Sequence, residues 1–223
     1  LGSKEAKHRY YAAKALANSR RPVIYGGGGI VNANAYAEFR EFCLSDRLPV
    51  TLTVMGLGAF PAPHEQWLGV LGMHAGRGAN SALDGAELIV CVGARVGDRI
   101  TGKLSEFAPR AKFVHIDVDP AEISKNVPAH IPIVGDAKDV LTKLNREYRA
   151  LNPEGSRLED WWKQIREWQT TYPLRYEDSR DSEIKPQFMV ETMFEATDGD
   201  AIITSDVGQH QMWAAQYYGF TRP

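Results

Sequence analysis

Short apolar runs that alternate with helix-like segments constrain the fold of this chain more than any other feature. Hydrophobic residues fill most positions of these runs instead of every second one, which is typical of strands that helices cover on both faces. The chain therefore predicts an α/β fold, with a doubly wound and mostly parallel Rossmann-like sheet of about five strands. The expected strands are 23–25, 49–53, 87–92, 112–117 and 131–134.

Helices are expected before, between and after these strands, because apolar residues recur there at the spacing of one helix face. Asn34 is expected to cap the helix whose inner face holds Phe39 and Phe42. The other expected helices are 4–18, 76–83, 136–148, a Trp-rich segment at 158–172, 185–197 and a last helix with Trp213 and Tyr217.

The composition changes beyond residue 150 and predicts more than one unit. Because the second unit would lack strands to pair with, we expect an exposed apolar surface or disorder after about Leu158. That surface is expected to hold Phe188, Met189, Met193, Trp213 and Tyr217. The expected units are a sheet domain at 1–150, a linker with the Trp-rich helix at 151–184, and the beginning of another α/β unit at 185–223 with a strand at 200–205.

Charge and apolar patterning argue against several classes of protein. The 26 Lys and Arg residues nearly balance the 28 Asp and Glu residues, so the net charge of −2 does not favour a nucleic-acid partner. No long apolar run and no secretory leader occurs, which argues against a membrane partner and indicates the cytoplasm, although an organelle protein without its leader would look the same. Cys43 and Cys91 are expected to be buried free thiols, and no residues have the spacing of metal ligands.

The residues at the ends of the expected strands point to a nucleotide. In parallel α/β sheets, ligands bind beyond the carboxyl ends of the strands. Glycines let backbone amides approach a phosphate, arginines bind phosphate through paired hydrogen bonds, and carboxylates bind ribose hydroxyls. Together they suit a dinucleotide. The residues are Gly26 to Gly29, Thr53, Met55, Gly56, Gly93, Ala94, Arg95, Asp98, Arg99, Asp117, Val118, Asp119, Gly135 and Asp136.

Each of these signals has a plain structural alternative. The glycine run lacks the third glycine of G-x-G-x-x-G, since Val31 stands there, and it suits a tight turn as well. Arg95 and Arg99 suit surface ion pairs. Asp117 and Asp119 suit helix caps ahead of a proline. The joint interpretation is favoured because all of these residues fall at one edge of one sheet.

The histidines differ in what they indicate. His74 lies in a glycine-rich loop and is a candidate ligand contact, whereas His115 lies within a strand and is expected to be a core residue with its hydrogen bonds satisfied. His8, His64 and His130 are expected at the surface. No Ser-His-Asp or Cys-His arrangement can be assembled, so no catalytic residue is assigned.

Six stretches of the chain together carry a resemblance to a known family. They are 26–30, 53–58, 71–74, 93–103, 115–119 and 205–216. These stretches resemble the large subunits of acetolactate synthase (acetohydroxyacid synthase): the first five resemble the central FAD-binding domain, and the last resembles the start of the C-terminal domain that binds thiamine diphosphate. The resemblance implies a three-domain subunit with a further, N-terminal pyrimidine-binding domain, so that this chain corresponds to a fragment.

The resemblance also implies which residues contact the cofactors. Family members usually have Phe-Asp-Asp-Arg where this chain has Val-Gly-Asp-Arg, so Gly97 replaces a carboxylate that would bind the flavin. Thiamine diphosphate would contact Val207, Gly208, Gln209 and His210. FAD would contact Gly26, Gly27, Gly28, Thr53, Val54, Met55, Leu71, Gly72, Met73, His74, Gly93, Ala94, Arg95, Arg99, Asp117, Val118, Glu122, Gly135, Asp136 and Ala137.

The family reaction implied by the resemblance condenses pyruvate with a second 2-oxo acid, pyruvate or 2-oxobutyrate, in branched-chain amino acid biosynthesis. It uses thiamine diphosphate and Mg²⁺, while FAD undergoes no net redox change. The complete enzyme is expected to be a homo-oligomer with a possible regulatory small subunit. The chain alone is expected to bind FAD without turning over pyruvate, because the activating glutamate and the Mg²⁺ ligands belong to other parts of the family's subunit.

Three other functions compete with this one. Glyoxylate carboligase is a thiamine enzyme that also carries a non-redox flavin, but the stretches at 71–74 and 209–216 favour acetolactate synthase. A nicotinamide-dependent dehydrogenase is disfavoured by the broken glycine motif and by the missing acid about 20 residues beyond it. A non-catalytic nucleotide-binding or adaptor module is the third alternative. Bound flavin separates the flavoproteins from the dehydrogenase.

Overall fold

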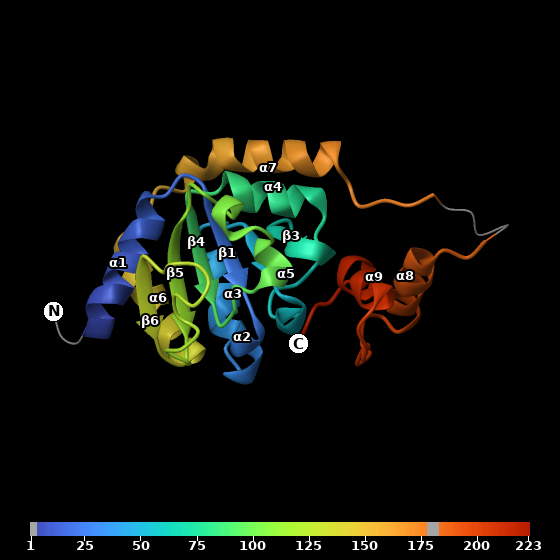
Figure 1. The fold of residues 1–223 in the computed structure, drawn as a ribbon, viewed down its shortest axis with the longest axis horizontal. Coiled ribbons are helices and arrows are strands. Elements are labelled where there is room, and N and C mark those ends of the chain that lie inside the picture. Colours follow the sequence, from blue (N-terminus) through green and yellow to red (C-terminus); the bar gives the residue numbers. More distant parts are fainter. Residues whose placement is uncertain (1–3, 178–182) are drawn as a thin grey trace.

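A single parallel sheet organises the chain. The computed structural model describes residues 4–177 and 183–223. Every pair of neighbouring strands is parallel, and their order is β3-β2-β1-β4-β5-β6 (Figure 1). This confirms the doubly wound Rossmann-like sheet, since dinucleotide-binding folds have this strand order. The strands are β1 Pro22–Gly26, β2 Val50–Leu52, β3 Trp67–Val70, β4 Leu88–Val92, β5 Lys112–Asp117 and β6 Ile131–Val134.

The edge strand β3 is the strand that the sequence did not predict. Its four residues include Gly69, whose φ of +105° is unusual for a strand, and its pairing with β2 shifts register between Val50 and Thr51. Only alternate residues, Leu68 and Val70, are buried. A strand this short and irregular lacks the continuous apolar run that reveals the central strands.

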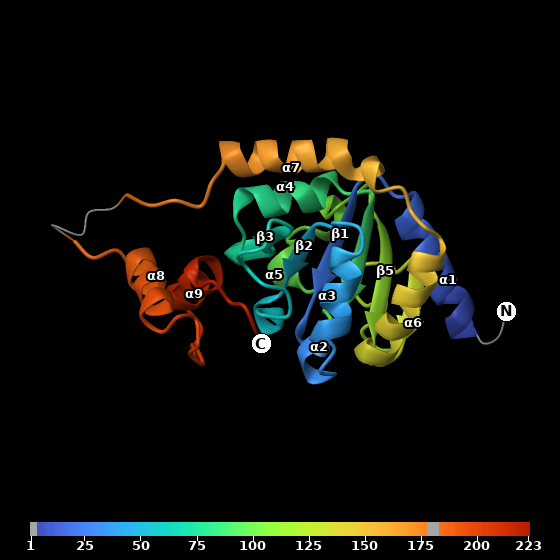
Figure 2. The same ribbon diagram turned by 180° about the vertical axis from the view of Figure 1, so that it is seen from behind.

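Helices cover both faces of the sheet. On one side α6 contacts both α1 and α3, and Figure 2 shows α3 and α6 in front of the strands. The connection from β3 to β4 runs through α4, on the other side. Asn34 does not cap α3 as expected: it has a φ of +50° in the preceding turn, and Ala35 occupies the cap position. These helices are α1 Lys4–Asn18, α2 Gly28–Asn32, α3 Tyr36–Leu44, α4 Arg77–Gly85, α5 Asp98–Thr101 and α6 Ala137–Ala150.

The core lies between the sheet and its helices. Ile24, Val90 and Val114, on three adjacent central strands, are at most 1% exposed, and each such side chain contributes roughly 1.5–3 kcal/mol through burial. Cys43 and Cys91 are free and buried, as the sequence predicted. Within residues 4–177 and 183–223, none of the helices has the length and apolar character that crossing a bilayer requires.

The Trp-rich helix α7, Glu159–Thr171, closes the end of the sheet at which the strands begin (Figure 1). The indole N–H of Trp161 donates to the carbonyl oxygen of Pro22 over 3.0 Å, and that of Trp162 donates to the carbonyl oxygen of Arg47 over 2.8 Å. Both rings are buried. The expected exposure or disorder beyond Leu158 is therefore wrong for this helix, because its apolar face packs on the sheet domain itself.

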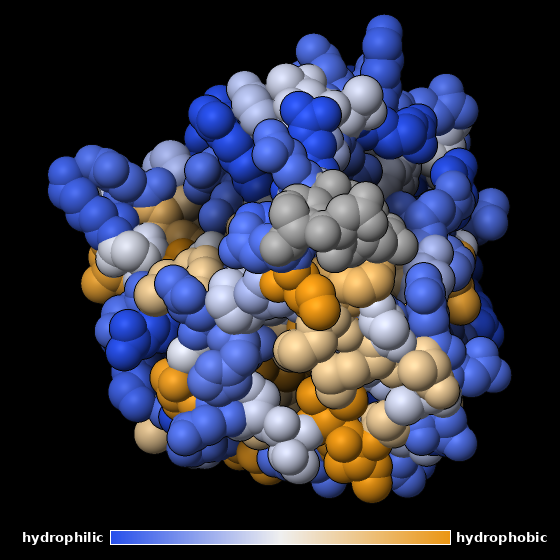
Figure 3. All heavy atoms as spheres, turned by 90° about the vertical axis from the view of Figure 1, so that its right-hand side faces the viewer, coloured by the Kyte–Doolittle hydropathy of each residue, from blue (hydrophilic) through white to orange (hydrophobic). Residues whose placement is uncertain are grey.

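The expected apolar surface does occur farther along the chain. Figure 3 shows apolar side chains gathered on the face that carries α8, Pro186–Ala196, and α9, Gln209–Tyr217. Met189 and Met193 are 50% and 42% exposed, whereas Phe188, Trp213 and Tyr217 are half-buried. The strand expected at 200–205 does not form. These residues have no neighbouring strand within the described part of the chain, and Ile202 is 95% exposed.

A buried ionic cluster fixes the start of α7. Arg157 pairs with Asp46 over 2.5 Å and donates to the hydroxyl of Tyr148 over 2.8 Å, and that hydroxyl donates to Asp46 over 2.5 Å. The side chains of Arg157 and Asp46 are only 10% and 5% exposed. Burial and the adjacent Asp46 raise the pKa of Tyr148. The cluster joins α6, the segment before β2 and the start of α7.

Replacing Arg157 is expected to destabilise the fold, because Asp46 would keep its charge in a buried position with its cation removed. Arg157→Ala should lower the free energy of unfolding by about 3 kcal/mol. Arg149→Ala is the matched control: Arg149 pairs with Glu41 at the surface, so its loss should cost less than about 1 kcal/mol. Urea unfolding of both variants measures the difference, and equal losses would contradict a stabilising role for the cluster.

Candidate functional site

The sheet reverses its winding between β1 and β4, and this point carries two of the glycine-containing loops. The chain leaves β1 toward β2 on one side, whereas β4 lies on the other side and leads to β5. Ligands of open α/β sheets bind at such a switch point, beyond the carboxyl ends of the strands. The run Gly26 to Gly29 follows β1, and Gly93, Ala94 and Arg95 follow β4.

The loops after β1 and β4 are packed backbone against backbone. The N–H of Gly27 donates to the carbonyl oxygen of Val92, and that of Gly29 donates to the carbonyl oxygen of Gly93, both over 2.9 Å. A Cβ on Gly27 would lie 2.3 Å from the carbonyl oxygen of Gly93 and 2.5 Å from the Cα of Ala94. Gly93 itself has a φ of +54°. The close packing of the two loops requires glycine at Gly27 and Gly93 whether or not a ligand binds, which agrees with the tight-turn interpretation.

The loop after β2 meets the same edge. Thr53 donates its N–H to the carbonyl oxygen of Gly26 over 2.8 Å, and the short helix η1, Val54–Gly56, comes next. A Cβ on Gly28 would lie 3.1 Å from the Cβ of Met55. Met55 is 75% exposed. The loops after β1 and β2 thus form one continuous rim with the loop after β4.

The loop after β3 closes this rim at its far side. Leu71 precedes the short helix η2, Gly72–His74. A Cβ on Gly72, whose φ is +77°, would lie 2.2 Å from the carbonyl oxygen of Arg99, so the loops after β3 and β4 touch. Met73 lies beside Arg99, with 3.9 Å between its sulfur and Nη1.

The ends of β5 and β6 extend the rim in the other direction. Gly135 donates its N–H to the carbonyl oxygen of Asp117 over 2.9 Å, which joins the two strand ends. Val118 is 69% exposed. Asp136 caps α6 by accepting from the N–H groups of Lys138 and Asp139, ahead of Ala137. Asp136 therefore has a structural role whatever binds beside it.

Asp117 and Asp119 do not cap a helix as one alternative proposed. Asp117 accepts from the N–H of Asp119 and Asp119 from that of Ala121, both over 2.9 Å, within a turn. Glu122 pairs with Lys125 over 2.8 Å at the outer part of this turn.

Three features of the rim fit an anionic dinucleotide. The hydroxyl of Thr53 is buried without a hydrogen-bond partner in the described part of the chain. Arg95 and Arg99 are exposed, and neither forms an ion pair within residues 4–177 and 183–223, so the surface ion-pair alternative does not hold for them. The exposed side chains of Met55 and Met73 add apolar surface for a flat ring system. The donor set therefore suits phosphates, hydroxyls and an aromatic group together.

The residues expected at thiamine diphosphate lie apart from this rim. Val207 is 84% exposed and precedes α9 with Gly208, while Gln209 and His210 begin that helix. Figure 1 shows α9 beyond the β3 edge of the sheet. The link between the two regions is a hydrogen bond of 2.9 Å from the side chain of Gln216 to the carbonyl oxygen of His74.

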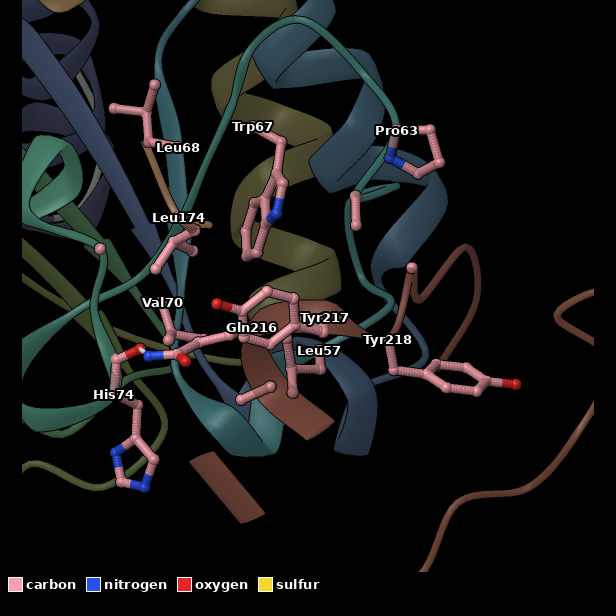
Figure 4. A pocket seen from close by; sticks show the side chains of 15 residues that line it. Leu57, Pro63, Trp67, Leu68, Val70, His74, Leu174, Gln216, Tyr217 and Tyr218 are labelled. Carbon is pink, nitrogen blue, oxygen red and sulfur yellow. Dashed lines mark hydrogen bonds between the residues drawn. The ribbon is translucent and has the colours of Figure 1, made fainter. Parts of the chain in front are cut away.

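A cavity of about 310 Å³ lies along this link, and the sequence did not predict it. Trp67, Leu57 and Tyr217 line it, whereas the imidazole of His74 points away from it (Figure 4). The walls of this cavity come largely from β3 and α9. Because β3 was not among the expected strands, the cavity could not be predicted from the sequence. The sequence signal that could have indicated β3 is the short run Trp67–Val70, whose alternate residues are buried in the structure.

A larger hollow of about 850 Å³ lies at the opposite end of the sheet, where the strands begin. Trp161 and Trp168 line it together with four arginines and four acids, so its charges balance. Burial raises the pKa of Glu87, but hydrogen bonds from the N–H groups of Arg20 and Arg21 outweigh it, and the net pKa lies below its ordinary value. Its acids make this hollow a poor match for an anionic ligand. The charged residues are Arg20, Arg21, Arg110, Arg157, Asp84, Glu87, Glu154 and Asp160.

The other histidines agree only in part with expectation. His115 is 3% exposed and hydrogen-bonded, which confirms it as a core residue. His130 is exposed, but His8 and His64 are half-buried. His8 is drawn in by a hydrogen bond of 2.6 Å to the carbonyl oxygen of Pro132.

Comparison with known proteins decides the family. Residues 11–144 match the model of the thiamine pyrophosphate enzyme central domain. This chain belongs to the thiamine pyrophosphate enzymes. The chain is 45% identical over 217 residues to the acetolactate synthase isozyme 3 large subunit of Escherichia coli strain K12. The aligned region covers 95% of this chain and 37% of that protein.

Other relatives give the same result for this thiamine pyrophosphate enzyme chain. The acetolactate synthase large subunit of Buchnera aphidicola from Acyrthosiphon pisum is 45% identical over 212 residues, with 95% of this chain and 37% of that protein covered. The acetolactate synthase of Mycobacterium bovis is 43% identical over 213 residues, with 95% and 34% covered. The resemblance to acetolactate synthase large subunits is thereby confirmed, and the chain spans about a third of the length of these curated relatives.

A methyl group on Gly27 is expected to separate the two packed loops. Gly27→Ala should lower the free energy of unfolding by about 1–3 kcal/mol, because its Cβ would overlap backbone atoms of Gly93 and Ala94. Gly97→Ala is the matched control: its φ of −97° suits alanine and nothing lies within 4 Å of its Cβ, so the change should stay below about 1 kcal/mol. Thermal and urea unfolding measure both, and a neutral Gly27→Ala would show that the loops are not in contact.

Proposed function

We propose that this chain is the flavin-binding part of an acetolactate synthase large subunit, and that the rim formed by the loops after the strands binds FAD. The observation that carries the proposal is that Arg95 and Arg99 form no ion pair, and the buried hydroxyl of Thr53 has no hydrogen-bond partner, within the described residues of this one edge of the sheet. Identities of 43–45% to acetolactate synthases over 95% of the chain support it independently.

The residues of the rim divide by the chemistry they offer. Arg95 and Arg99 would bind the diphosphate, since arginine matches phosphate oxygens through paired hydrogen bonds. Asp117 would accept from ribose hydroxyls. The hydroxyl of Thr53 would complete its hydrogen bonding on the cofactor, and Met55 would cover part of the flavin ring. The remaining members of the rim supply backbone and shape.

One position differs from the usual pattern of the family. Gly97 takes the place of an aspartate that would accept a hydrogen bond from the flavin. Nothing lies within 4 Å of a Cβ built there, so the site has room for the missing carboxylate. We propose that the flavin is bound here with one acceptor fewer, which places more of the affinity on Arg95, Arg99 and Asp117.

In the complete enzyme, thiamine diphosphate held with Mg²⁺ supplies the electron sink for decarboxylating pyruvate and joining it to a second 2-oxo acid. In that chemistry the residues of this chain would bind and orient the cofactors. Val207, Gly208, Gln209 and His210 would contact thiamine diphosphate at the start of α9. No residue of this chain is proposed to be catalytic, and we expect the chain alone to bind FAD without condensing 2-oxo acids.

The wider setting is part of the same proposal. We place the flavin-binding domain at 1–150, the linker at 151–184 and the start of the thiamine diphosphate domain at 185–223. The complete enzyme would act in the cytoplasm on small 2-oxo acids, as a homo-oligomer with a possible regulatory subunit. The exposed apolar residues of α8, such as Met189 and Met193, support further packing partners for this region.

Two of the competing functions lose support. The match to the thiamine pyrophosphate enzymes disfavours a nicotinamide-dependent dehydrogenase. Glyoxylate carboligase would share the flavin site, but the relatives compared above are acetolactate synthases.

Removing the Arg95 guanidinium is expected to weaken FAD binding. Arg95→Ala should raise the dissociation constant about 10-fold or more, because a charge-assisted hydrogen bond contributes about 1.5–3 kcal/mol. Arg20→Ala removes another exposed arginine, at the other end of the sheet, and should leave the affinity unchanged. Titration followed by flavin fluorescence measures both. Saturable binding with the same affinity in Arg95→Ala and the unaltered chain would refute the proposed site.

A further inference from the structure

The carbonyl oxygen of Ala94 is held from inside the protein by two side chains. The thiol of Cys91 lies 3.1 Å from this oxygen, and Nε2 of His115 lies 3.2 Å from it. Cys91 and His115 stand opposite each other on the paired strands β4 and β5. They are 0% and 3% exposed, so the oxygen is turned into the core beneath the rim.

The protonation of both groups is set by their surroundings. Burial lowers the pKa of His115 below its ordinary value, although the charge of Asp117 opposes this, so the ring is neutral and carries one N–H. A carbonyl oxygen only accepts, so that proton is on Nε2. Burial also raises the pKa of Cys91, which therefore remains a thiol and donates its S–H. The oxygen thus accepts from two neutral donors.

The direction of the Ala94 carbonyl fixes the direction of the next N–H. In a trans peptide the C=O and the following N–H point to opposite sides, and the described residues contain no cis peptide bond. With the oxygen of Ala94 turned inward, the N–H of Arg95 points out of the core. Within the described part of the chain this N–H donates to no protein acceptor. Arg95 is exposed at the rim of the switch point.

We propose that His115, supported by Cys91, is a positioning residue for cofactor binding: it holds the Ala94–Arg95 peptide so that the N–H of Arg95 faces the dinucleotide. This inference rests on the proposed FAD site. The backbone N–H of Arg95 then adds a donor, fixed by the core, to the flexible guanidinium of the same residue. An oxygen of the cofactor's diphosphate is the acceptor that this pair suits.

The test compares two replacements of His115 in this chain. His115→Leu removes the donor, whereas His115→Gln places an amide N–H at a similar reach. We expect His115→Leu to weaken FAD binding about 10-fold and His115→Gln to stay within about threefold of the unaltered chain. His130→Leu is the control, because His130 accepts from the N–H of Phe113 where β5 begins, far along the strand from Ala94. It should leave the affinity unchanged.

A spectroscopic readout separates positioning from general loosening of the fold. With ¹⁵N-labelled arginine, FAD should shift the backbone amide resonance of Arg95 strongly in the unaltered chain and in His115→Gln, but weakly in His115→Leu. If His115→Leu does not fold, Cys91→Ala against Cys91→Ser gives the same comparison, with about a threefold loss expected for alanine only.

The outcomes are distinguishable. FAD binding by the unaltered chain with equal affinity in His115→Leu overturns the positioning role and leaves the proposed function standing. Equal weakening in His115→Leu and His115→Gln overturns it too, because the donor would then not matter. Absence of FAD binding by the unaltered chain overturns both this inference and the proposed function.

Discussion

The contact between the glycine run after β1 and the Gly93–Ala94 segment after β4 is the constraint on which the rest of the site depends. It leaves no room for a side chain at Gly27, and it holds two loops together at the one point where the sheet reverses its winding. The loops after β2 and β3 are then attached to these two by their own close contacts, at Gly28 and at Gly72. A continuous rim results, and it carries the Thr53 hydroxyl and the Arg95 and Arg99 guanidinium groups, of which the first has no hydrogen-bond partner and the other two form no ion pair among the described residues.

The two ends of the sheet are built for opposite purposes. Where the strands begin, α7 covers the sheet, its indoles satisfy backbone carbonyls, and Arg157 is neutralised by Asp46. Where the strands end, Arg95 and Arg99 stand without acidic partners in the described residues. One end is closed and its arginines face acids, whereas the open end carries two arginines that form no ion pair among the described residues, so an anionic dinucleotide is expected at the open end.

Sequence patterns predicted the parts of this structure that depend on local periodicity and on strand ends. The five strands that were predicted are apolar runs, and in a parallel sheet the loops that leave such strands all lie at one edge. The patterns failed where the formation of a strand depends on whether another strand lies beside it. Residues 200–205 are as β-branched as a strand but have no strand beside them among the described residues, and β3 forms only because β2 offers it an edge. The buried face of α7 could not be foreseen, because the partners of Trp161 and Trp162 are backbone carbonyls more than 100 residues away. The inward direction of the Ala94 carbonyl could not be predicted either, because it depends on His115 from the neighbouring strand.

The most direct measurement is a crystal structure of this chain grown with FAD. The account predicts the diphosphate between the loops after β1 and β4, within hydrogen-bonding distance of Arg95, with the hydroxyl of Thr53 no longer unpartnered. FAD lodged instead against Trp161 and Trp168 at the opposite end of the sheet, with the rim empty, would contradict it.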